Sequence, residues 1–195
     1  MSGASVLAGC GFGLRTGAGV SRTTEPVMLP SSIEDPPTAV DASLGTEWIE
    51  LEVLADYHRV RPIFVLGAGL GQTRFRGMDT RSPRPFFAED GNFLARVGGG
   101  VGFAPVAIGP IRPAPYVLYT RNYGVLASTL RSSLEVGLDV ELTYDEKITF
   151  VVGAALMYES GNAEIRESCC YEGAFDTQGV VVTFGGRFGG VRFDQ

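Results

Sequence analysis

The residues of this sequence that could carry chemistry are charged side chains placed two positions apart. Glu50 and Glu52 form one such pair. Glu135 and Glu141, farther along the chain, are also separated by an even number of positions. Paired carboxylates can serve as acid and base in glycoside hydrolysis. The same spacing places them on one face of a strand, where arginines can neutralise them. We favour an arginine–carboxylate network, whose expected members are Arg15, Glu50, Glu52, Asp56, Arg96, Glu135, Asp139, Glu141 and Arg187.

Other candidates for catalysis or metal binding are sparse. His58 is the one histidine, and no serine stands near it in sequence. Cys169 and Cys170 are adjacent, which strains a disulfide between them, and they lack the further His or Cys that a metal site needs. The glycine-rich runs are not followed by the Gly-Lys-Ser/Thr of a phosphate-binding loop. We therefore predict no catalytic, metal or cofactor site.

The overall composition excludes several classes of protein. The chain has 195 residues and a net charge of −6, with 16 basic against 22 acidic residues and no basic stripe. This balance argues against nucleic-acid binding. No run of 18 apolar residues is present, so we expect no transmembrane helix, whereas a spanning β-strand needs only about 9–11 residues.

Apolar and polar residues alternate with period two along much of the chain, which indicates β-strands. The clearest stretch is 132–144, where Leu134, Val136 and Leu138 oppose Glu135 and Asp139. The other stretches are 11–20, 49–58, 63–75, 93–103, 147–158 and 180–189, with a weaker one at 114–123 that lacks clear parity. Eight such strands predict an all-β fold, an eight-stranded antiparallel up-and-down transmembrane β-barrel.

The connections between these stretches alternate in length. Tight turns are expected near 59–62 and at 145–146, and a Pro/Gly-rich link near 105–113. Long polar loops are expected at about 21–46, 77–91 and 159–178, with a shorter one near 124–131. Short turns on one rim and long loops on the other are typical of outer-membrane barrels.

Glycines crowd the polar face of the predicted strands, and they decide which face is inside. Gly67, Gly69, Gly98, Gly100 and Gly185 belong to this face. A solvated face has no steric need for glycine, which weakens strands. A narrow barrel interior does, because large charged side chains must fit opposite small ones. The charged network is therefore expected to fill the lumen, with the apolar face toward lipid.

The last strand carries the most specific resemblance to a known family. Residues 180–193 place aromatic side chains at Phe184, Phe188 and Phe193. This pattern resembles the small outer-membrane barrels such as the OmpA transmembrane domain and OmpX, whose final strand ends in a phenylalanine that resembles an assembly signal. Here Phe193 is followed by Asp194 and Gln195, and its parity differs from that of Phe184 and Phe188. The resemblance implies a location in the bacterial outer membrane.

The amino terminus offers a possible lipid anchor. Residues 7–10, Leu-Ala-Gly-Cys, look like a bacterial lipoprotein processing box with Cys10 as the lipidated residue. The alternative is that Cys10 is simply a small strand residue. We interpret residues 1–10 as a signal remnant or N-terminal extension and 11–195 as a single barrel domain.

Four functions fit a barrel of this kind. We rank first a structural or interaction barrel with a plugged lumen, in contact with outer-membrane lipid and presenting its long loops to a protein partner. The alternatives are a narrow channel, a lipid-modifying enzyme that would use His58, and a soluble lipocalin-like binder with inverted faces.

Overall fold

The protein is described by a computed structural model, and its described residues form β-strands joined by turns. No helix among them has the length and hydropathy needed to cross a membrane. The described ranges are 9–25, 27–29, 38–56, 59–78, 85–103, 108–124, 130–145, 148–165 and 171–188.

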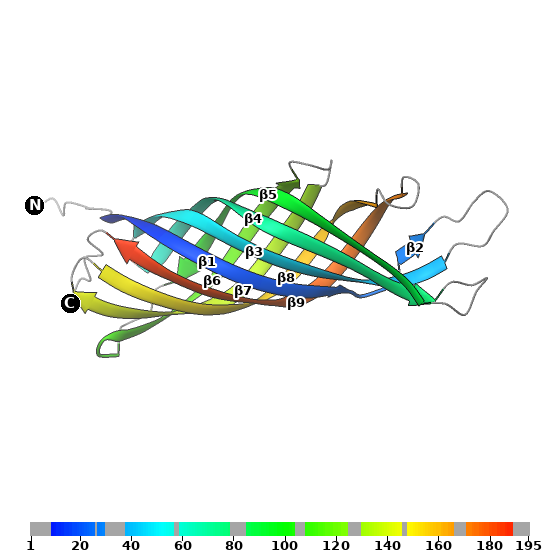
Figure 1. Ribbon diagram of the computed structural model, residues 1–195. Helices are drawn as coiled ribbons and strands as arrows, with labels where there is room; N and C mark the ends of the chain where they lie inside the picture. The colour runs from blue at the N-terminus through cyan, green and yellow to red at the C-terminus, as the bar shows by residue number, and fades with distance from the viewer. Residues whose placement is uncertain are drawn as a thin grey trace, which may run out of the picture.

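Eight long antiparallel strands close into one barrel (Figure 1). Each strand pairs with its neighbours in chain order, and β1 pairs with both β3 and β9, which closes the ring. The short β2 pairs only with the start of β3. The strands are β1 (Gly9–Thr23), β2 (Val27–Leu29), β3 (Thr38–Asp56), β4 (Val60–Met78), β5 (Pro85–Phe103), β6 (Ile111–Gly124), β7 (Leu130–Asp145), β8 (Ile148–Ile165) and β9 (Tyr171–Phe188). The predicted fold is confirmed.

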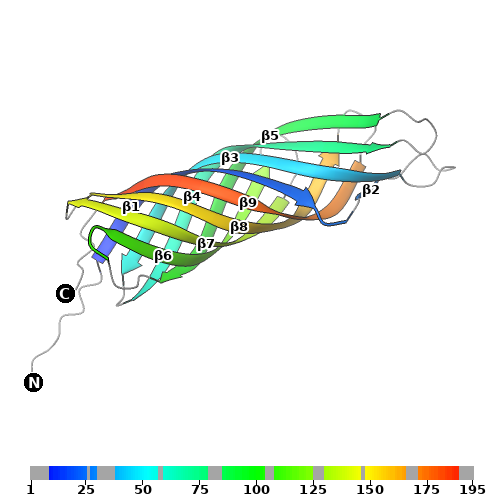
Figure 2. The ribbon, with the colours of Figure 1, turned by 90° about the horizontal axis from the view of Figure 1, so that it is seen from below.

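The strand register fixes the width of the barrel. Direct partners followed from Gly13 around all eight strands return to β1 at Thr23, ten residues farther along. A shear of this size with eight strands corresponds to a tilt of about 35–45° and an interior just wide enough for side chains. Figures 1 and 2 show this strong tilt, with β3, β4 and β5 reaching far beyond the rim opposite the start of β1.

The burial pattern places the apolar faces outside. Along β6, buried and exposed residues alternate almost without interruption. The outward residues include large hydrophobic side chains on every barrel strand, among them Leu156, which is 69% exposed, and Phe12, which is 62% exposed. Charged residues such as Glu135 are buried in the lumen. The alternative of a soluble lipocalin-like barrel is wrong, because that arrangement needs the opposite orientation.

The strands are longer than the sequence indicated. The predicted loop 21–46 contains the end of β1, all of β2 and the start of β3. The predicted loop 77–91 is likewise shortened by the end of β4 and the start of β5. The predicted loop 159–178 is shortened by the end of β8 and the start of β9. The backbone ladder continues where both faces carry polar residues, so the period-two signal fades before the strand ends.

Two predicted connections near prolines were also placed incorrectly. β4 begins at Val60, so Pro62 lies within the strand and not in the turn. β6 begins at Ile111 and holds Pro113 and Pro115. Its described pairing with β5 starts only at Tyr116, so these prolines lie where β6 pairs with β7 alone. Proline is tolerated where a strand lacks a neighbour on one side.

The sequence of β6 lacked a clear alternation of apolar and polar residues because its lumen face carries Ala114, Tyr116 and Leu118.

Candidate functional site

The lumen is filled by buried charges of both signs. Among the described residues, six arginines and six carboxylates have relative exposures of 5% or less. They are Arg15, Arg61, Arg96, Arg112, Arg131, Arg187, Glu50, Glu52, Glu135, Asp139, Glu141 and Glu159. Charges taken out of water need partners and hydrogen bonds to be tolerated, so their pairing is the central feature of this interior.

Seven of these residues gather near the rim where β1 begins and β9 ends, and we call them the terminal-side cluster. Arg61 and Arg112 are each the second residue of their strand, and Arg187 is the last but one of β9. The cluster consists of Arg15, Arg61, Arg112, Arg187, Glu52, Asp139 and Glu141.

Arg187 joins all three carboxylates of the terminal-side cluster. Its Nε donates to Glu52 Oε2 at 2.9 Å, and its Nη2 donates to Asp139 Oδ2 at 2.9 Å. Its Nη1 donates to Glu141 Oε1. These three acids come from β3 and β7, so one side chain of β9 ties together strands from different parts of the barrel wall.

Glu141 is the matching hub for the arginines. Its Oε1 accepts from Arg61 as well as from Arg187, and its Oε2 accepts from Arg112 Nε at 2.8 Å. Charge-assisted hydrogen bonds of this kind are about twice as strong as neutral ones. Three arginines on one carboxylate leave Glu141 with both oxygens satisfied.

Arg15 completes the cluster toward the middle of the lumen. Its Nη1 donates to Glu52 Oε1 at 3.2 Å, and its Nη2 donates to Tyr116 Oη at 2.6 Å and to Thr183 Oγ1 at 3.1 Å. Its guanidinium carbon also lies 4.8 Å from the centre of the Tyr116 ring. Aromatic and hydroxyl side chains thus serve the network alongside the carboxylates.

The other five charges lie farther from that rim, and we call them the loop-side cluster: Arg96, Arg131, Glu50, Glu135 and Glu159. Arg96 is its centre. Its Nε donates to Glu50 Oε2 at 2.7 Å, its Nη2 to Glu135 Oε1 at 2.5 Å, and its Nη1 to Thr120 at 3.0 Å. Its guanidinium lies 4.5 Å from the Trp48 ring centre. Glu159 lies within electrostatic range of Arg131 and Arg96.

Glycines make room for these side chains. A Cβ on Gly13 would lie 2.9 Å from Glu52 Oε2 and 3.2 Å from Arg187 Cγ. A Cβ on Gly153 would overlap Asp139 Oδ1 and Thr183 Oγ1. At these two positions a charged side chain of a neighbouring strand occupies the space of a Cβ, whereas Gly67 and Gly100 lie against the backbone of the next strand.

The structure brings together eight of the nine residues proposed from the sequence for the network. Arg15, Glu52, Asp139, Glu141 and Arg187 lie in the terminal-side cluster. Glu50, Arg96 and Glu135 lie in the loop-side cluster. The ninth, Asp56, is the last residue of β3 and pairs with Gly9, and its side chain lies outside the described part.

Sequence reasoning missed four buried charges: Arg61, Arg112, Arg131 and Glu159. Each lay in a predicted turn, link or loop. Each also continues the parity of a lumen face by one step, as Arg61 does before Ile63 and Glu159 does after Met157. These four residues could therefore have been found by continuing the period-two assignment of faces beyond the last apolar residue of each predicted strand.

The remaining candidate residues are not tested by the structure. His58, Cys169, Cys170 and Phe193 lie outside the described residues. Cys10 lies in β1 opposite Ala55, and its lipidation stays a prediction. Across the described ranges, no group of three or more His, Cys, Asp or Glu residues could hold a metal ion.

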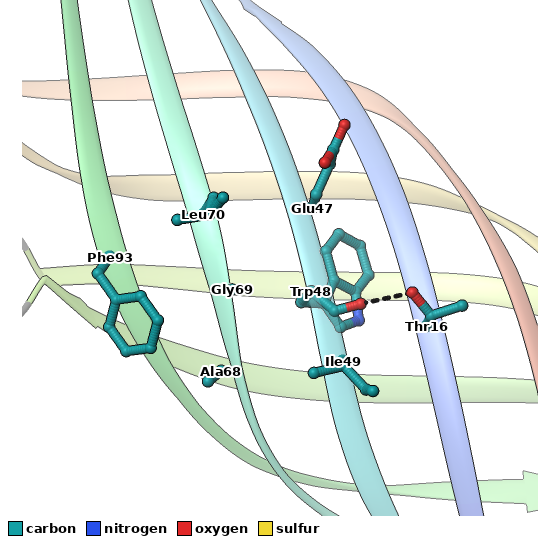
Figure 3. A pocket seen from close by; sticks show the side chains of 8 residues that line it. All are labelled: Thr16, Glu47, Trp48, Ile49, Ala68, Gly69, Leu70 and Phe93. Carbon is teal, nitrogen blue, oxygen red and sulfur yellow. Dashed lines mark hydrogen bonds between the residues drawn. The ribbon is translucent and has the colours of Figure 1, made fainter.

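The outer wall carries a shallow depression of about 310 Å³ over β1, β3, β4 and β5 (Figure 3). Ile49, Leu70 and Phe93 line it, together with the small residues Ala68 and Gly69. Thr16 Oγ1 donates to the backbone oxygen of Trp48 at 2.9 Å beside it. The depression is mostly lined by outward residues, so it belongs to the wall and not to the charged lumen.

Comparison with known proteins identifies the fold. No protein-family model matches the chain, and neither does any curated protein. The solved structure of outer membrane protein AlkL in lipid bilayers is 11% identical, covers 100% of this chain and 97% of its own, and has a TM-score of 0.53. Neisserial surface protein A is 11% identical over 91% of this chain and 96% of its own, with a TM-score of 0.42.

The beta domain of the Bordetella autotransporter BrkA is 11% identical over 92% of this chain and 99% of its own, with a TM-score of 0.34. The likeness to AlkL carries the argument, and it concerns the fold. The chain is an eight-stranded barrel of the outer-membrane type.

Proposed function

We propose that the protein is a structural or interaction barrel of the bacterial outer membrane whose lumen is closed by its arginine–carboxylate network. The single observation that carries this proposal is the interior itself. Among the residues that the structure describes, six arginines and six carboxylates are buried there, as equal numbers of opposite charges. A permeable pore would leave such groups lining water, and here their relative exposures are at most 5%.

The terminal-side cluster is the proposed plug. Arg187 and Glu141 each contact several partners from other strands, so together they cross-link the wall of the barrel. An eight-stranded interior is just wide enough for side chains. The connections at the opposite rim are proposed to contact a protein partner, as the sequence suggested.

A narrow channel is the second candidate, favoured by one observation in the loop-side cluster. Glu50 Oε1, Glu135 Oε2 and Glu159 Oε2 are buried and accept no hydrogen bond in the structure. Buried polar atoms are normally satisfied by protein or ordered water. Water in this half of the lumen would support ion conduction only if a continuous water path also led through the terminal-side cluster.

Planar-bilayer recording of the folded protein tests the plug. The proposal predicts no conductance steps for the natural sequence. Removing Arg187 and Glu141 together, as Arg187→Ala with Glu141→Ala, leaves the net charge unchanged and is expected to open steps. The matched control is Phe188→Ala with Leu142→Ala, which alters the outward neighbours in the same two strands and should stay silent. Steady steps from the natural sequence would favour the narrow channel and contradict the plug.

A further inference from the structure

Arg121 lies on the outer face of the barrel, which is mostly apolar. It lies in β6 among outward residues and is exposed, whereas the other arginines of β6 and β7, Arg112 and Arg131, face the lumen. Within the described residues, no carboxylate forms a salt bridge with Arg121. Its Nε donates to Tyr119 Oη at 3.4 Å.

Hydroxyl groups surround this guanidinium on the outer wall. Tyr123, two residues farther along β6, lies on the same outward face and is exposed. Ser132 lies directly opposite Arg121 on β7. One cation and three hydroxyl groups therefore share a small outward patch, which we call the Arg121 patch: Tyr119, Arg121, Tyr123 and Ser132.

The Arg121 patch lies at the margin of the apolar wall. Toward the terminal rim, the nearest large apolar outward residues of these two strands are Val117, Leu134 and Val136, and each is at least 40% exposed. Toward the other rim, β6 ends at Gly124, and on β7 only Leu130, its first residue, follows on this face. Tyrosine is enriched at such margins because its ring is apolar and its hydroxyl is polar. An arginine on the lipid face costs about 2–4 kcal/mol at the bilayer midplane and about 0–1 kcal/mol near its edges.

The chemistry of the patch is that of a phosphate site. A guanidinium donates two parallel hydrogen bonds to phosphate, and hydroxyl groups donate to its remaining oxygens. The apolar residues immediately beside it suit acyl chains. We propose that the Arg121 patch binds the phosphate of a lipid headgroup, in the leaflet away from the terminal rim, with the acyl chains of that lipid lying along Val117, Leu134 and Val136.

This inference rests on the proposed membrane location and gives the barrel a specific lipid partner. The outward position of Arg121, its freedom from carboxylates in the described structure and the adjacent apolar wall all point to a lipid. A free phosphate would use the guanidinium but would gain nothing from the apolar wall. A carboxylate of a partner protein would likewise leave the wall without an occupant.

Native mass spectrometry of the full chain in detergent tests the proposal. The probes are phosphatidylglycerol and, as a lipid without phosphate, monogalactosyldiacylglycerol with the same acyl chains. We expect Arg121→Gln to weaken phosphatidylglycerol binding about tenfold, which is the loss of one charge-assisted contact. The matched control is Arg22→Gln, which removes an exposed outward arginine of β1 and should leave binding unchanged.

Three results would overturn the lipid site: equal binding by Arg121→Gln and the natural sequence, equal weakening by Arg22→Gln, or equally tight binding of the galactolipid. Displacement of phosphatidylglycerol by millimolar inorganic phosphate would also overturn it, in favour of a free-phosphate site. Ser132→Ala with Tyr123→Phe is a second variant that keeps the charge and is expected to weaken binding about threefold by removing two hydroxyl partners.

Heat-dependent gel mobility of each variant is recorded first, which separates the two proposals. A natural sequence that shows no shift contradicts the membrane barrel. A shifted band combined with unchanged lipid binding contradicts the Arg121 patch alone.

Discussion

The terminal-side and loop-side clusters are built from the same residue types but differ in how completely they are paired. The terminal-side cluster has four arginines for three carboxylates, and both oxygens of Glu52 and of Glu141 accept hydrogen bonds. Its third carboxylate, Asp139, has one oxygen, Oδ1, that accepts no hydrogen bond but lies 3.5 Å from Arg15 Nη2. The loop-side cluster has two arginines for three carboxylates. There, one oxygen on each of Glu50, Glu135 and Glu159 accepts no hydrogen bond in the structure.

This difference indicates that the two ends of the lumen have different roles. An excess of one positive charge at one end and of one negative charge at the other makes the twelve described lumen charges neutral in sum. The densely cross-linked end is suited to closing the barrel and holding its strands together. The loop-side end, where all three carboxylates have an unsatisfied oxygen, is suited to taking up water, as buried polar atoms do.

The largest effect should come from removing the hub of the terminal-side cluster. Arg187→Met leaves Glu52, Asp139 and Glu141 short of a partner, and we expect a loss of about 3–5 kcal/mol in the free energy of unfolding. The measurement is a urea titration in lipid vesicles followed by the fluorescence of the one tryptophan, Trp48, which is buried in the lumen. A loss below 1 kcal/mol would show that this cluster does not hold the barrel together.

A charge placed on the outer wall should cost nearly as much. Val136→Arg puts a guanidinium on a lipid-facing position that is 52% exposed, and we expect a loss of about 2–4 kcal/mol in the same titration. The control is Val60→Arg at the first residue of β4, near the edge of the wall, with an expected loss of about 0–1 kcal/mol. Equal effects at the two positions would contradict a membrane around the barrel.

The loop-side hub should matter less than Arg187. Arg96→Met removes the partner of Glu50 and Glu135, but water can solvate these carboxylates if this half of the lumen is wet. We expect a loss of about 1–3 kcal/mol, the cost of leaving a buried polar group unsatisfied. A loss equal to that of Arg187→Met would mean that the two clusters are equally dry and would remove the proposed distinction.

The smallest effect should come from a methyl group added beneath the terminal-side cluster. Gly13→Ala places a Cβ against Glu52 and Arg187, and we expect a loss of about 1 kcal/mol from overpacking. Gly91→Ala is the matched control, because nothing lies within 4 Å of its added Cβ, and its effect should stay within about 0.5 kcal/mol. If both variants behave alike, the lumen around Gly13 is looser than its contacts indicate.

The sequence allowed the barrel and most of its charged interior to be predicted, because both depend on strict alternation. Glu50 and Glu52 alternate with exposed Ile49 and Leu51, so their shared face could be recognised locally. Arg61 and Arg131 were missed because the apolar half of the pattern stops near them. The strand ends were predicted incorrectly for the same reason. Backbone pairing continues without a hydrophobic face, so the strands extend beyond the alternating pattern.

The partners of each charge could not be predicted. Arg15 and Glu52 are 37 residues apart, and Arg187 and Glu52 are 135 residues apart. Such contacts depend on barrel closure and on its shear, which are properties of the whole sheet. The outward Arg121 is visible in the sequence, but its significance appears only once the two faces are assigned.

Heat-dependent gel mobility of the protein folded in detergent, with a parallel test of solubility in plain buffer, measures the central claim most directly. The account predicts that the unboiled band migrates differently from the boiled one and that the protein needs detergent to stay in solution. A protein that is monodisperse in plain buffer and shows no mobility shift would contradict a barrel with its apolar face toward lipid.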